Sequence, residues 1–104
     1  MILTTLETVP SKNIIEHYGL VQGSTIRATH IGKDIMAGFK NLIGGEIKSY
    51  TELLQEAREE AVARMEQQAE QKGANAVVSI RFATSSVIQG AAELFAYGTA
   101  VKVE

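Results

Sequence analysis

The side chains with the clearest capacity for chemistry in this sequence are two histidines and a nearby carboxylate. The histidines are His17 and His30, and Asp34 follows His30 by four positions. Imidazole and carboxylate groups bind Zn²⁺ or Ni²⁺, so His17, His30 and Asp34 are the candidate ligands of a divalent metal ion. His30 and Asp34 would share a face if a helix began near His30. Glu16 would point to the opposite side of a strand from His17.

The spacing of these residues argues against a metal site within one chain. Metal sites usually need three or four converging ligands, and two scattered histidines match no metal-binding motif. The sequence has no cysteine, which removes the thiolates that soft metals prefer. Two surface or partly buried histidines without a metal are therefore the simpler interpretation. An oligomer could still bring copies of one histidine together around a symmetry axis.

Other patterns that could carry chemistry are weaker. The segment from Gly19 to Gly23 has neither the lysine nor the helix opening of a phosphate-binding loop, so its glycines are expected to shape a strand. Ser85-Ser86 lacks the flanking glycines of a nucleophile elbow. Arg81 lies on the polar face of a predicted strand, where a salt bridge with a helix glutamate is the simplest interpretation. We therefore expect no enzymatic activity.

The composition excludes several classes of function. The chain has 104 residues, a net charge of −2 and a sequence pI of about 5.7. Nucleic-acid binding is not expected, because it needs a basic surface to neutralise phosphates. Residues 1–10 lack the basic and apolar regions of a signal peptide, and no apolar stretch is long enough to cross a bilayer. We expect a single cytoplasmic domain over residues 1–104.

A long amphipathic helix is predicted over residues 49–72. Ser49 and Glu52 form a capping box at its start, and Lys72 followed by Gly73 is a typical end. At 1.5 Å per residue the helix would be about 36 Å long. Apolar and small residues recur every three or four positions, as on one face of a helix. They are Tyr50, Leu53, Leu54, Ala57, Ala61, Met65 and Ala69.

The rest of the chain reads as strands with one further helix. Alternating apolar residues predict strands, and the tight connection after Gly73 predicts that the long helix folds back along their sheet. The fold class is therefore α+β, with a small antiparallel or mixed sheet packed against the long helix. The expected strands cover 2–6, 11–29 (one bent strand or two), 76–82 and 94–103, with a connection over 83–93 and a short helix over 33–43.

The last predicted strand indicates assembly. Both of its faces are apolar over much of their length, with Phe95 and Tyr97 on one of them. One long helix covers one face of a sheet, and soluble monomers rarely leave a large apolar patch exposed. The sheet edges also need covering or pairing. A homo-oligomer satisfies both needs. A monomer with the short helix on the second face is the alternative.

Several short blocks of the sequence stand out together. They are Thr4-Thr5, Gly19-Leu-Val-Gln-Gly23, Gly44-Gly45, Tyr50 with Leu54, Ala57-Arg58 and Ala61, Gly73-Ala-Asn-Ala-Val-Val78, and Gly98-Thr-Ala-Val101. With these blocks the chain resembles, over nearly its whole length, the YbjQ family of small, uncharacterised bacterial proteins. The resemblance implies a dodecin-like α+β subunit that assembles as a homo-pentamer or a multiple of five. It also implies a heavy-metal-binding label without a mechanism, and it supplies no catalytic residues.

Two functions of different classes follow. The first is a non-catalytic oligomer that holds a metal ion or a small ligand at its subunit interfaces, because repeated interfaces supply pockets. The second is a structural or protein-interaction module without a small ligand. The first is favoured narrowly, because the family label points the same way.

Overall fold

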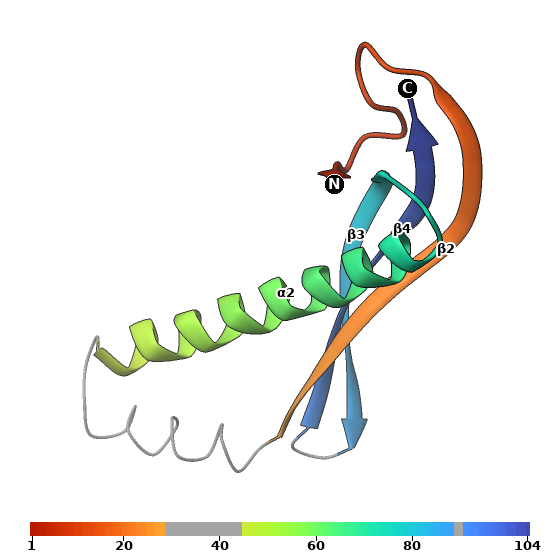
Figure 1. The fold of residues 1–104 in the computed structure, drawn as a ribbon. Coiled ribbons are helices and arrows are strands. Elements are labelled where there is room, and N and C mark those ends of the chain that lie inside the picture. The colour runs from red at the N-terminus through yellow and green to blue at the C-terminus, as the bar shows by residue number, and fades with distance from the viewer. Residues whose placement is uncertain (29–44, 89–90) are drawn as a thin grey trace.

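The computed structural model describes residues 1–28, 45–88 and 91–104, which form one sheet with a long helix across one face (Figure 1). The strand order is β1-β3-β4-β2, so the last strand in the sequence lies inside the sheet. β1 runs parallel to β3, and the other pairs are antiparallel. The predicted α+β class with a mixed sheet is therefore confirmed. The elements are β1 (Ile2–Leu3), β2 (Ile14–Ala28), α2 (Gly45–Gln71), β3 (Ala76–Ile88) and β4 (Ala91–Val103).

The helix is longer than predicted at its start. It begins at Gly45, so Ser49 lies inside the first turns and the predicted capping box is wrong. Residues 46–48, which lie before the predicted start, are also helical. Gly73 ends the helix with a φ of 90°, as predicted. The short helix expected over 33–43 lies outside the described residues.

The strands β3 and β4 are also longer than predicted. The segment 83–93 was expected to be a connection, but β3 continues to Ile88 and β4 starts at Ala91. Ala83 pairs with Phe95, and Ser85 pairs with Glu93. Small and polar residues are poor indicators of strands, because the cross-strand partner rather than intrinsic propensity decides their conformation. The result is that β3 and β2 pair with β4 on either side along nearly its full length.

The two glycines of β2 have different roles. Gly19 has a φ of 89° and lies at a shift in the pairing of β2 with β4, where the strand bends. Gly23 lies directly under α2. A Cβ atom added to Gly23 would lie 2.2 Å from the carbonyl oxygen of Ala61 and 2.4 Å from the amide nitrogen of Met65. The helix backbone therefore rests on the strand backbone at this point.

Two groups of buried side chains hold the layers together. The first lies between α2 and the sheet and confirms the predicted helix face from Ala57 to Ala69. The second lies on the other face of the sheet, where residues 1–13 cross it. The first contains Val21, Ala61, Met65, Ala69, Ala74, Val77, Ile80, Ala96 and Ala100, and the second contains Val9, Ala76, Val78, Val101 and Val103.

Asn75 joins the end of the helix to the central strand. Its side-chain Nδ2 donates to the carbonyl of Val103 (2.9 Å), and its Oδ1 accepts from the amide of Val103 (2.8 Å). The Asn75 backbone amide also donates to the carbonyl of Val101 (3.1 Å). The Asn75 side chain thus makes the pair of hydrogen bonds to Val103 that the backbone of a neighbouring strand would make. This explains the block from Gly73 to Val78 as a structural feature.

The folded chain is elongated. Its principal extents are 55 × 26 × 18 Å and its radius of gyration is 16.9 Å, compared with about 13 Å for a compact domain of this length. The N-terminal half of α2 projects beyond the strands (Figure 1). Leu20 and Ile26, on the sheet face opposite α2, remain 64% and 58% exposed.

Replacing Gly23 by alanine is expected to destabilise the fold strongly. The new methyl group would overlap the backbone of α2, which cannot move without losing the packing of Met65. We expect a loss of about 3 kcal/mol in the free energy of unfolding, measured by urea denaturation at a fixed protein concentration. The exposed neighbour Gln22→Ala is the control and should change it by less than about 0.5 kcal/mol. Equal stability of the two variants would contradict the close contact.

Candidate functional site

Of the three predicted metal ligands, His17 lies in the described part of the chain. His17 is exposed on β2 and pairs with Val101 of β4. His30 and Asp34 lie outside the described residues. Within residues 1–28, 45–88 and 91–104, no three histidine or carboxylate side chains are close enough to hold a metal ion. The described residues of one chain therefore do not form a metal centre by themselves.

The surroundings of His17 contain one polar contact. The hydroxyl of Tyr18 donates to Oε2 of Glu16 at 2.9 Å. This hydrogen bond, together with desolvation and the negative charge of Glu16, raises the pKa of the Tyr18 phenol above its usual value. The Glu16 carboxylate is thus hydrogen-bonded to Tyr18.

A more developed concave surface lies between α2 and β3. This groove has a volume of about 380 Å³ and is open to solvent. Val62, Ala63 and Phe82 supply its apolar surface, and the Phe82 side chain is 50% exposed. The groove exists because α2 rests over β2 and β4, which leaves the helix-facing side of β3 uncovered beyond Ile80. The lining residues are Arg58, Glu59, Val62, Ala63, Glu66 and Phe82.

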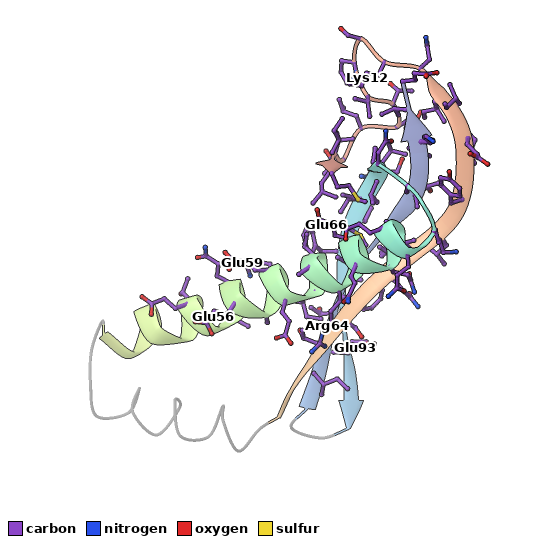
Figure 2. All side chains as sticks on the ribbon, in the orientation of Figure 1. Lys12, Glu56, Glu59, Arg64, Glu66 and Glu93 are labelled. Carbon is purple, nitrogen blue, oxygen red and sulfur yellow. The ribbon has the colours of Figure 1, made fainter. Side chains whose placement is uncertain are left out.

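The charges at the groove are on the helix. Glu59 accepts a hydrogen bond from Nε2 of Gln55 at 3.3 Å, and Glu56 and Glu59 project from α2 in Figure 2. Arg58 has no acidic residue three or four positions away along the helix. The groove can therefore accept an apolar group beside charges of both signs. Its described lining contains no nucleophile paired with a base, so it offers no catalytic geometry.

Sequence reasoning missed this groove. The alternating pattern predicts a strand that ends at Phe82, but only the lateral position of α2 over the sheet shows that the Phe82 side chain is half exposed. Arg81 was expected to form a salt bridge with a helix glutamate. Its Nη1 instead donates to the backbone carbonyls of Thr5 (3.0 Å) and Ile80 (2.8 Å), so that prediction is wrong. Arg81 holds the N-terminal segment against β3.

The outer edge of β2 is closed by side chains of α2. Oε1 of Gln68 accepts a hydrogen bond from the amide of Gln22 at 2.7 Å. Nη1 of Arg64 donates to the carbonyl of Ser24, while Nη2 pairs with Glu60, as the spacing predicts. Figure 2 shows Arg64 on the side of α2 toward the strands. Two helix side chains therefore bond outward-facing backbone groups of this edge at Gln22 and Ser24.

Comparisons with known proteins connect the chain to one family. The family model YbjQ_1, described as "Putative heavy-metal-binding", matches residues 1–104. A UPF0145 protein of Hahella chejuensis is 64% identical over 104 residues, with both chains fully covered. A UPF0145 protein of Archaeoglobus fulgidus is 56% identical, covering 99% of this chain and 95% of its own. A relative from Thermus thermophilus is 53% identical, covering 100% and 91%.

One solved structure is similar in fold. It is the crystal structure of a protein of unknown function of the DUF74 family from Pediococcus pentosaceus, with a TM-score of 0.66 at 14% sequence identity. The match covers 100% of this chain and 98% of that chain. At this identity the likeness concerns the fold alone. No helical segment in the described ranges combines the length and apolar character that a bilayer crossing requires.

Replacing Gln68 by leucine tests the closed edge of β2. The amide of Gln22 loses its acceptor, so we expect a loss of about 1 kcal/mol in the free energy of unfolding. Hydrogen exchange of the Gln22 amide should become faster. Gln67→Leu, at the exposed neighbouring helix position, is the matched control. If both variants exchanged the Gln22 amide at the wild-type rate, Gln68 would not be its partner.

Proposed function

The chain belongs to the YbjQ family, and from this premise we propose that it is a non-catalytic subunit of a homo-oligomer that holds a small ligand or metal ion where subunits meet. The observation that carries this proposal is the uncovered part of the sheet. Leu20 and Ile26 are mainly exposed on the face opposite α2, and no described element covers them. Soluble monomers rarely expose apolar patches of this kind.

The same face carries the aromatic residues of β4. Phe95 and Tyr97 are half-buried, with ring centroids 5.9 Å apart and planes inclined by 34°. Leu20 and Ile26 are distant in sequence from these rings, but the pairing of β2 with β4 places them on the same face. Aromatic and aliphatic side chains of this type are typical of subunit contacts. The elongated shape supports the proposal, because a thin two-layer subunit gains a core by packing against copies of itself.

The ligand would then be bound by more than one subunit. The described residues of one chain do not gather three metal ligands, whereas symmetry would bring several copies of an exposed side chain such as His17 together. The family description makes a divalent metal the first ligand to test. The resemblance suggests a pentamer or a multiple of five. An assembly without a small ligand, acting as a protein-interaction module, is the alternative.

Native mass spectrometry of the purified protein, with and without Zn²⁺, Ni²⁺ and Cu²⁺, tests the proposal. We expect an assembly of five subunits or a multiple of five, with a stoichiometric additional mass. Comparing His17→Ala with His30→Ala would then assign the ligand, since only the true ligand position should lose the metal while the assembly stays intact. An empty assembly that ignores all three metals would favour the interaction module. A monomer would overturn the proposal.

Introducing a charge on the open sheet face should dissociate the assembly. In Phe95→Asp a carboxylate replaces a half-buried aromatic ring, and burying it between subunits is costly. We expect a smaller mass by light scattering, with Thr8→Asp, an exposed position on the N-terminal segment, as the control. A Phe95→Asp variant that kept both the wild-type mass and melting temperature would contradict a role for this face.

A further inference from the structure

The two outer edges of the sheet differ in how their backbone N–H and C=O groups are hydrogen-bonded. Along β2, Gln68 and Arg64 occupy the amide of Gln22 and the carbonyl of Ser24. Along β3, the N-terminal segment covers only the first part of the strand. The amide of Ile80 donates to the carbonyl of Thr4 (3.1 Å). This hydrogen bond lies close to the point where the N-terminal segment stops following β3.

Beyond Arg81 the outer edge of β3 has no partner among the described residues. The N–H and C=O groups of alternate strand residues point to the same side. Since the amide of Ile80 points away from β4, those of Phe82, Thr84 and Ser86 point away from it as well, up to the register shift between Ser86 and Ile88. This set of outward-facing backbone groups is the free edge of β3.

The free edge lacks the features that normally prevent strand addition. Exposed edges usually carry a charge, a proline or a covering side chain. From Phe82 to Ala92 the sequence contains no charged residue and no proline. The α2–β3 groove lies alongside, with the half-exposed ring of Phe82 on its surface. A strand added to this edge would cover that ring and complete one side of the groove.

We propose that the free edge of β3 pairs with the same edge of a second copy of the chain, antiparallel and around a two-fold axis at Thr84. Such a register places Thr84 opposite Thr84 and Phe82 opposite Ser86, so every group of the free edge is used. At Gln22 and Ser24 the edge of β2 is already bonded to Gln68 and Arg64, so a strand added there would have to displace both side chains. The uncharged edge also brings no like charges together on self-pairing.

This inference rests on the proposed homo-oligomer and specifies one of its contacts. A two-fold contact is isologous, since the same residues of both copies form it. Alone it gives a dimer. Added to a ring it joins two rings, so the assembly has twice the mass of the ring. Loss of this contact should therefore halve the mass of the assembly and leave any other contact intact.

Thr84→Lys and hydrogen exchange test the contact. Thr84 is exposed in the subunit, so lysine is tolerated in the isolated chain but places two like charges together at the axis. We expect Thr84→Lys to have half the wild-type mass by native mass spectrometry, with an unchanged circular dichroism spectrum. The matched control Thr8→Lys, also exposed, should keep the full mass. In the wild type, the amides of Phe82 and Thr84 should exchange at least about tenfold more slowly than in Thr84→Lys.

Each other outcome has a definite meaning. Fast exchange of the Phe82 and Thr84 amides in an assembled wild type would overturn the edge contact, whatever the variant does. An unchanged mass of Thr84→Lys would do the same, and the proposed oligomeric function would stand in both cases. Dissociation into species smaller than half the wild-type mass would overturn the two-fold arrangement. A monomeric wild type would overturn the proposed function, and this contact with it.

Discussion

The contact between the backbones of α2 and β2 at Gly23 sets the position of the helix over the sheet, and the rest of the described structure depends on that position. A side chain at this position would overlap the helix, so only glycine permits the approach. The helix side chains at this contact are correspondingly small. Ala57 and Ala61 are buried near the crossing, and Met65 fills the remaining space. The hydroxyl of Thr25, a buried polar group, is satisfied by the carbonyl of Ala57 at 3.3 Å. The close approach thus leaves this hydroxyl paired.

The position of this contact explains the two surfaces with functional interest. Because α2 is anchored over β2, its polar side chains Arg64 and Gln68 reach the outer edge of that strand. For the same reason β3 is left without helix cover at Phe82, where the groove opens. One edge of the sheet is closed and the other is accessible. A helix placed over the centre of the sheet would neither reach the outer edge of β2 nor leave β3 uncovered at Phe82.

The sequence was sufficient for the local elements and insufficient for their lateral placement. The alanine-rich stripe and Gly73 predicted the helix and its end, because both are local signals. The strand segment 83–88 was missed, because its small polar residues become strand only through pairing with β4. The groove was missed because no periodicity reveals which strand a helix rests on. The metal candidates His17, His30 and Asp34 stay a prediction, since ligands shared between copies leave no spacing pattern in one chain.

The position of β4 inside the sheet has a consequence for the order of folding. β4 is the last element in the sequence, yet β2 and β3 are joined only through it. The pairing of Ile14 with Val103 spans nearly the whole chain. During synthesis β2, α2 and β3 emerge before β4, and β2 and β3 cannot join one sheet until β4 has left the ribosome. Contacts of such long sequence separation slow folding, so the nascent chain exposes its β2 segment for longer than a local hairpin would.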